Sequence, residues 1–182
     1  MNTYVEDLIG SLNLEVVSEL QTDSRSERRR HLPEEILVGT LPERLKRLLG
    51  RDDHTVWEHQ ARAIEHLANR RNVVVSTGTA SGKSLVFQID AIRRLSSDAS
   101  AKILVIYPLK ALASDQFGRW KRLVKYMGID ESTVGRIDGN VPTHERDATL
   151  SNASILLMTP DVCHAWLMRN VGSGPVRRFL EG

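Results

Sequence analysis

A segment near residue 80 has the residue types and the spacing needed to bind a nucleotide. Its eight residues are Thr77, Gly78, Thr79, Ala80, Ser81, Gly82, Lys83 and Ser84. The last three match the end of the phosphate-binding loop G-x-x-x-x-G-K-[ST], although Thr77 stands where that pattern has glycine. In such a loop the backbone N–H groups surround a phosphate, the lysine reaches the β and γ oxygens, and the hydroxyl ligates Mg²⁺. We therefore predict that this segment binds ATP, with Lys83 on the phosphates and Ser84 on the metal ion.

Gln60 is a candidate for reading the nucleotide base. A glutamine side chain has one acceptor and two donors, so it can bond the N6 amino group and N7 of adenine together. The residue lies in a predicted helix upstream of the loop, where a solvent-facing glutamine is the simpler interpretation. The neighbouring His59 fits a polar helix residue better than a catalytic one.

Loops after three other apolar runs hold residues suited to a nucleic-acid backbone. Thr159 is a predicted N-cap with Pro160 at the first helical position, so free N–H groups and the helix dipole would face one phosphate. A plain helix cap explains the same pair. Lys110 follows another run just beyond Pro108. Gly139, after a third run, allows close backbone approach. Because parallel strands end at one edge of a sheet, we expect these loops to line one path for successive phosphates.

Short apolar runs alternate with helical patterns from residue 73 onward. The predicted strands are 73–75, 102–107, 134–137 and 154–158, and the predicted helices are 83–95, 111–127 and two that begin at Pro142 and Pro160. Such alternation is typical of an α/β fold in which helices cover both faces of a parallel sheet. Upstream, we predict one helix from Pro42 to Gly50 and another that begins at a capping box of Thr55 and Glu58.

The first 40 residues are a predicted N-terminal extension. Residues 1–20 have a weak helical period, and residues 21–31 are polar and charged, which is typical of a linker. The cluster Arg28-Arg29-Arg30 has the charge to contact nucleic acid, but an exposed linker explains it more simply.

Composition places the chain among globular proteins. It has 182 residues, 41% of them hydrophobic and 26% charged, and no apolar run approaches the ~20 residues that would span a bilayer. A single cysteine, Cys163, excludes an internal disulfide and favours a reducing, cytoplasmic location without membrane contact. Residues 1–24 hold five acids and no base, so the remainder has 25 bases against 18 acids. That moderately basic body suits a phosphate-containing partner.

Four segments together resemble a known family. They are Glu58 to Ile64, Thr77 to Ser84, Tyr107 to Gln116, and Thr159 to Asp161. In this order they are similar to the Q motif and motifs I, Ia and Ib of the first RecA-like domain of superfamily 2 DEAD/DEAH-box helicases. Family members often replace the first loop glycine, as Thr77 does. The T-x-T-A-S-G-K wording, the Leu41-Pro42 helix and Asp138-Gly139-Asn140 look most like DNA helicases of the mitomycin-repair type.

The resemblance covers residues 41–182 and implies an ATP-binding lobe of an ATP-dependent helicase or translocase. It implies that ATP and Mg²⁺ are cofactors and that a single strand, DNA rather than RNA, is the partner. The nucleotide residues it implies are Gln60 and Thr77 to Ser84. The strand-contacting residues it implies are Pro108, Lys110, Gln116, Gly139, Asn140, Thr159, Pro160 and Asp161.

Some family motifs do not occur in these 182 residues. The D-E-x-H or D-E-A-D sequence of motif II, motif III and the second RecA-like domain are not found, so we expect a partial, N-terminal fragment that ends before motif II. We expect it to bind ATP and single strands weakly without turnover, and to need the C-terminal half in cis or in trans. Two alternatives stay open: a non-catalytic regulatory module that binds nucleotide or nucleic acid, and a small P-loop kinase.

Overall fold

The computed structural model describes residues 28–78 and 81–181, and these divide into two compact units. The loop unit comprises Met1–Leu37 and Asp53–Asp90, of which the described part begins at residue 28. The sheet unit comprises Val38–Asp52 and Ala91–Gly182. The predicted helix at residues 1–20 and most of the predicted linker lie outside the described residues.

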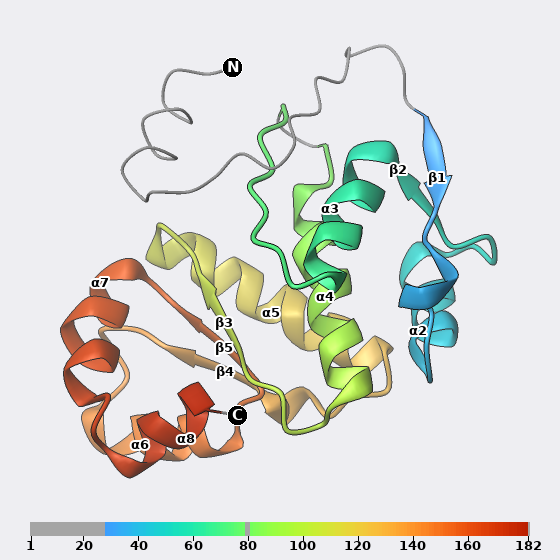
Figure 1. Ribbon diagram of the computed structural model, residues 1–182. Coiled ribbons are helices and arrows are strands. Elements are labelled where there is room, and N and C mark those ends of the chain that lie inside the picture. The colour runs from blue at the N-terminus through green and yellow to red at the C-terminus, as the bar shows by residue number, and fades with distance from the viewer. Residues whose placement is uncertain (1–27, 79–80, 182) are drawn as a thin grey trace. The chain divides into compact units, whose positions relative to one another are not determined.

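Three parallel strands form the centre of the sheet unit (Figure 1). They are β3 (Ile103–Ile106), β4 (Val134–Ile137) and β5 (Ile155–Met158), in the order β3-β5-β4. In register, Ile106 and Ile137 both pair with Met158, so the three strands end level with one another. All four residues of β5 are buried, which explains a run without any polar residue. The parallel sheet predicted from the strand–helix alternation is confirmed.

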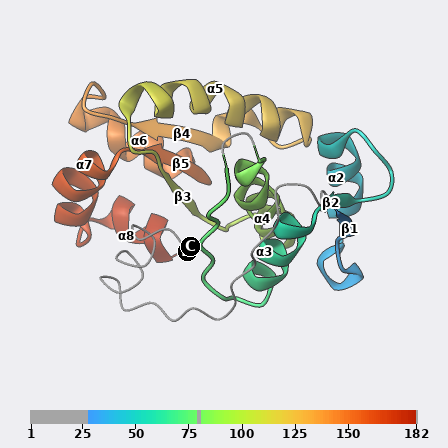
Figure 2. The ribbon, with the colours of Figure 1, turned by 90° about the horizontal axis from the view of Figure 1, so that it is seen from above.

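Helices cover both faces of this sheet, as expected (Figure 2). Those of the sheet unit are α2 (Leu41–Leu49), α5 (Lys110–Tyr126), α6 (Thr143–Asn152), α7 (Pro160–Val162) and α8 (Gly174–Glu181). The long α5 contacts β4 and β5 on one face, and α6 and α8 lie on the other. The predicted helix from Pro160 is one α-helical turn, followed by a wider π turn (Cys163–Leu167) and a 3-10 turn (Met168–Asn170).

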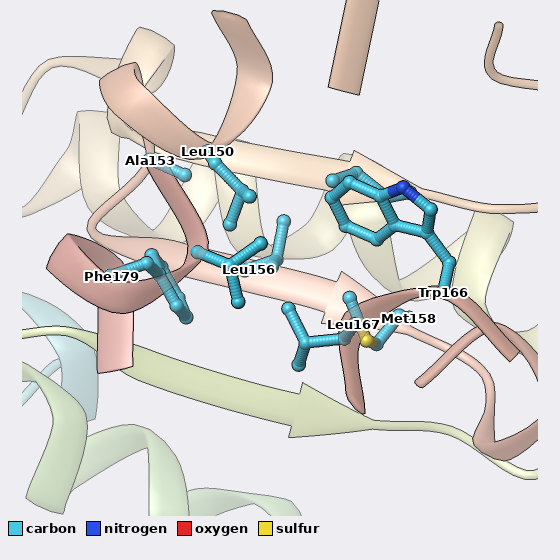
Figure 3. Close-up of a cluster of buried hydrophobic side chains, with 9 residues drawn as sticks. Leu150, Ala153, Leu156, Met158, Trp166, Leu167 and Phe179 are labelled. Atoms are coloured by element: carbon cyan, nitrogen blue, oxygen red, sulfur yellow. The ribbon is translucent and has the colours of Figure 1, made fainter. Parts of the chain in front are cut away.

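A buried apolar cluster fills the face of the sheet opposite α5 (Figure 3). Leu156 and Met158 of β5 point into it and meet Trp166 and Phe179, which come from the segment after β5. On the other face, Trp120 of α5 is fully buried. These buried side chains hold the sheet between its two helical layers, because close-packed interiors leave the strands and helices little freedom to move.

The described part of the loop unit contains a small antiparallel pair of strands and two α-helices. Strand β1 (Arg29–His31) pairs with β2 (Thr55–Trp57), and α3 (Glu58–Ala68) follows β2 directly. Helix α4 (Lys83–Ser97) begins in this unit and runs across the boundary into the other. Within the parts of the chain that the structure describes, no helix is both long and apolar enough to cross a membrane.

The predicted strand at Val73–Val75 is wrong. Residues 71–78 are neither strand nor helix, and Val74 is 53% exposed. A β-branched run favours extended backbone, but a strand also requires a neighbour whose N–H and C=O groups complete the ladder. No described residue pairs with this segment in a sheet. The sequence pattern correctly indicates that these residues prefer an extended backbone, but it does not indicate whether a neighbouring strand is present to pair with them.

The predicted capping box at Thr55 and Glu58 is also wrong. Thr55 lies in β2, and its hydroxyl donates to Asp53 Oδ1 at 2.9 Å. Helix α3 instead begins at Glu58, where Gln60 Oε1 accepts a hydrogen bond from the Trp57 N–H at 2.9 Å. The side chain of Gln60 therefore satisfies the backbone N–H at the start of the helix. The sequence pattern assigns that role to Glu58.

Replacing Leu156 by alanine tests how the sheet unit is held together. Leu156 is fully buried at the centre of the cluster, so we expect a loss of about 2–5 kcal/mol in the free energy of unfolding. Leu180→Ala is the matched control, because Leu180 is 46% exposed and should cost within about 0.5 kcal/mol. Urea titration followed by circular dichroism measures both. Equal losses in the two variants would contradict the packing described.

Candidate functional site

The phosphate-loop lysine lies against the loop that it closes. Lys83 opens α4, and its Nζ donates to the carbonyl oxygens of Thr77 at 2.8 Å and Gly78 at 2.6 Å. The hydroxyl of Ser81 lies 3.5 Å from the same ammonium group and 2.5 Å from Thr77 Oγ1. The structure thus brings the lysine and both ends of the predicted loop together. Thr79 and Ala80 lie outside the described residues.

Gln60 connects α3 to this loop. It is 2% exposed, and its Nε2 donates to the carbonyl of Gly82 at 3.0 Å while its Oε1 accepts from Trp57 N–H. His59 Nε2 lies 3.2 Å from the Ser81 carbonyl. The solvent-facing alternative for Gln60 is therefore wrong. Sequence reasoning considered Gln60 for the base and missed its contact with the loop, since no local pattern relates residues 60 and 82.

Helix α3 is in turn held by the arginine cluster at the start of the described chain. Arg30 forms a two-bond contact with Glu65, at 2.8 and 3.1 Å, and lies 3.7 Å from Glu58. Arg29 stacks over the Trp57 ring at 4.4 Å. Arg29 and Arg30 lie in β1 rather than in a linker, although Arg28 and Arg29 are exposed as expected. Because its residues are charged, β1 lacks the hydrophobic pattern by which a strand is predicted. Acidic and aromatic partners on α3 and β2 explain why these arginines pack there.

Ser84 offers its hydroxyl in the first turn of α4, and the side chain is exposed. It was our one predicted metal ligand from the protein. Within the described residues there is no group of three or more His, Cys, Asp or Glu side chains that could hold a metal ion.

Each β-strand of the sheet unit is followed by one of the loops that are predicted to contact single-stranded nucleic acid. Lys110 begins α5 after β3, and its Nζ lies 4.0 Å from Asp138 Oδ1 in the loop after β4. Asp138 is 3% exposed, and it also faces Arg136 Nε at 3.4 Å and accepts from the Asn140 backbone N–H at 2.8 Å. Two of the predicted loops are thus joined by a buried carboxylate.

The other predicted contact residues lie in or near the same loops. Pro108, Gly139, Asn140, Pro160 and Asp161 are exposed, and Gln116 is partly exposed. Thr159 follows β5 at the N-cap position of α7, but its hydroxyl makes no capping hydrogen bond and the residue is 7% exposed. The predicted N-cap position of Thr159 and the first helical position of Pro160 are confirmed, although the Thr159 side chain does not make the capping hydrogen bond.

Tyr107 anchors the loop that places Lys110. Its hydroxyl accepts a hydrogen bond from Trp120 Nε1 at 3.0 Å, which connects the end of β3 to the middle of α5. Burial raises the pKa of the Tyr107 phenol, and the bond from Trp120 opposes that change. Tyr107 is 8% exposed, so a buried, neutral side chain holds the start of α5 in place.

Comparison with protein-family models identifies residues 57–178 as a DEAD/DEAH box helicase match. This chain belongs to the DEAD/DEAH box helicase family. The matched range contains the phosphate loop, the Gln60 contact and the loops after all three strands, so the resemblance noted from the motifs is confirmed.

Curated helicases and a solved helicase structure are similar to this family member. It is 35% identical over 122 residues to the ATP-dependent helicase hrq1 of Schizosaccharomyces pombe, covering 66% of this chain and 12% of that protein. It is 28% identical over 169 residues to the uncharacterized ATP-dependent helicase YprA of Bacillus subtilis, covering 92% and 22%. The crystal structure of the DUF1998 helicase MrfA bound to DNA and AMPPNP matches with a TM-score of 0.75 and 26% identity, covering 97% and 24%. The RecA-like α/β fold is therefore confirmed, and the chain spans under a quarter of each of these relatives.

Replacing Gly82 by alanine tests the contact between α3 and the loop. Gly82 has φ +75°, and an added Cβ would lie 2.5 Å from Gln60 Nε2. The backbone alone should cost about 1–2 kcal/mol in unfolding free energy, and displacement of Gln60 adds to it. Gly78→Ala is the control, since a Cβ there meets nothing within 4 Å. Urea unfolding without nucleotide measures both. If both glycines tolerate alanine equally, Gln60 is not a brace of the loop.

Proposed function

We propose that this part of a DEAD/DEAH box helicase binds ATP and a single strand of DNA, as one lobe of an ATP-dependent helicase or translocase. The observation that supports the proposal most directly is the loop ending in Gly82-Lys83-Ser84, which opens α4 and surrounds the Lys83 ammonium. Lys83 is the residue that would meet the phosphate oxygens in a loop of this pattern.

The residues at the loop fit a nucleoside triphosphate with magnesium. Gly78 has open space where a side chain would be, and the positive φ of Gly82 gives the loop a turn that suits close backbone approach. Lys83 would hold the β and γ oxygens, Ser84 would ligate Mg²⁺, and the amides of residues 78–82 would surround the β-phosphate. Gln60 uses one N–H and one lone pair of Oε1 in its two bonds, which leaves its second N–H and the other Oε1 lone pair for the adenine edge.

The loops of the sheet unit fit a nucleic-acid backbone. Lys110 is half exposed, and Gly139 and Asn140 lie open beside it at the ends of the strands. Contacts of this kind read phosphates rather than bases, so binding should be salt-dependent and largely independent of sequence. The wording of the motifs supports DNA over RNA, and the similar MrfA structure was solved with DNA. Pro108, Gln116, Thr159, Pro160 and Asp161 complete the proposed path.

Turnover requires groups that we assign to the remainder of the helicase. In-line attack on the γ-phosphate depends on a carboxylate that positions water and on an arginine finger worth about 10³–10⁵ in rate in related enzymes. We propose that these come from the C-terminal half, in cis or in trans, and that this segment alone binds without hydrolysing. We also propose a cytoplasmic location, which the single cysteine of the sequence supports.

Lys83→Ala should abolish binding of ATP with Mg²⁺, because the loop then has no cation to face the β and γ oxygens. Lys125→Ala is the control, since Lys125 is a surface residue paired with Glu131 and should leave the affinity unchanged. Isothermal titration calorimetry with the 182-residue chain measures both. Equal affinity of wild type and Lys83→Ala would refute the nucleotide site.

Lys110→Ala should weaken single-strand binding uniformly across sequences, from a starting Kd of about 10⁻⁴–10⁻⁶ M. The slope of log affinity against log salt should fall by about 0.7, the value for one phosphate on a single strand. Thr159→Val should also weaken binding but with less change in slope, since Thr159 is neutral. Fluorescence anisotropy of a labelled oligonucleotide over a salt series measures both. Two variants indistinguishable from wild type at every salt concentration would show that the loops are only structural.

A further inference from the structure

One face of α5 continues away from the proposed strand path as a line of polar and basic side chains. Lys110, Ser114, Phe117 and Lys121 follow at intervals of four, three and four residues, which places them on one side of the helix. Arg136 of β4 lies against the same line. We call these five residues the basic strip. At 1.5 Å per residue its length is about 16 Å, comparable with several stacked nucleotides.

Side-chain contacts join the members of the strip into one row. Arg136 Nη1 donates to Ser114 Oγ at 2.7 Å, and the Arg136 guanidinium lies 5.3 Å from the centre of the Phe117 ring. Lys121 Nζ lies 4.9 Å from the same ring centre. Phe117 therefore holds one cation from its own helix and one from β4, at distances where the ring attracts both. The strip is an ordered group of side chains rather than a scatter of charges.

The buried carboxylate of Asp138 connects this strip to the proposed path. It faces Lys110 at 4.0 Å and Arg136 at 3.4 Å, so Lys110, which belongs to both the path and the strip, shares this anion with Arg136. Lys121 has no carboxylate within ion-pair distance among the described residues. Of the three cations in the strip, two share this anion and the third has no carboxylate partner, which leaves net positive charge along the strip.

The position of the strip on the sheet leaves it accessible. Strand β4 is at one end of the order β3-β5-β4, and Arg136 is on the face that α5 covers, near the free edge. Its side chain is 28% exposed, that of Lys110 is 50% exposed, and Ser114 is exposed. A charged residue near an edge strand also discourages pairing with another chain, and that role would need no ligand.

We propose that the basic strip extends the nucleic-acid path, so that phosphates beyond those at Lys110 bind along α5 at Arg136 and Lys121. This inference rests on the proposed single-strand function and adds residues that the four motifs do not contain. It follows from the unpaired charge of Lys121, the shared anion Asp138 and the linear spacing. Contacts with the phosphates should again be independent of base sequence.

Oligonucleotide length separates the strip from the loop path. The full chain is titrated with labelled oligothymidylates of roughly 6 and roughly 20 nucleotides, lengths that bracket common single-strand site sizes. Lys121→Glu should leave affinity for the shorter one nearly unchanged and weaken binding of the longer one, with a fall of about 0.7 or more in its salt slope. Arg178→Glu makes the same change in net charge and should affect the binding of neither oligonucleotide. Arg178 is exposed on α8, which lies on the other face of the sheet.

Each result distinguishes the strip from the path. If Lys121→Glu and Arg178→Glu behave alike at both lengths, or if Lys121→Glu weakens both lengths equally, the extension is wrong while the loop path stands. If the wild-type chain binds neither oligonucleotide, both proposals fall, and an acidic protein surface becomes the better partner for the strip. Circular dichroism checks folding, and Lys121→Gln replaces Lys121→Glu should the latter unfold; its loss of long-strand affinity must show the same dependence on length.

Discussion

The pairing of β5 with a parallel neighbour on each side determines where the functional loops of the sheet unit lie. Because Ile106 and Ile137 are both in register with Met158, three strands stop at one level and the chain leaves each of them at the same edge. The four buried residues of β5 make any shift of register costly, since each would exchange a packed side chain for another face. Lys110, Asp138 and Thr159 are therefore brought to one edge of the sheet although they are far apart in the sequence.

Charge at that edge is organised by burial as much as by residue type. Asp138 is almost inaccessible, yet it faces two cations and a backbone N–H, so its negative charge is balanced within the protein. The cations remain more exposed than their anion. An approaching polyanion therefore meets the positive ends of these pairs, which is the arrangement that favours phosphate contact over attraction of a cation.

The strands and helices of the sheet unit could be predicted because their sequences are locally unambiguous: Ile155–Met158 is wholly apolar, and α5 repeats apolar residues at helical spacing. The phosphate loop could be found from its tail. Two features could not. Val73–Val75 has strand residues but no described strand partner, and β1 reads Arg-Arg-His, whose pairing depends on Trp57 and Glu65 far along the chain. Local pattern specifies preference, whereas pairing and long-range contact decide the outcome.

The two bonds of Gln60 have a consequence for how a nucleotide would be discriminated. One amide group restrains both the start of α3 and the carbonyl of Gly82, at the threshold of the phosphate loop. A base that bonded to the free N–H and lone pair of this amide would immobilise the Gln60 side chain. Because that side chain also bonds to Gly82, the loop around Lys83 would become more ordered as well. Base and phosphate recognition would then be thermodynamically linked, so that a mismatched base weakens the grip on its own phosphates.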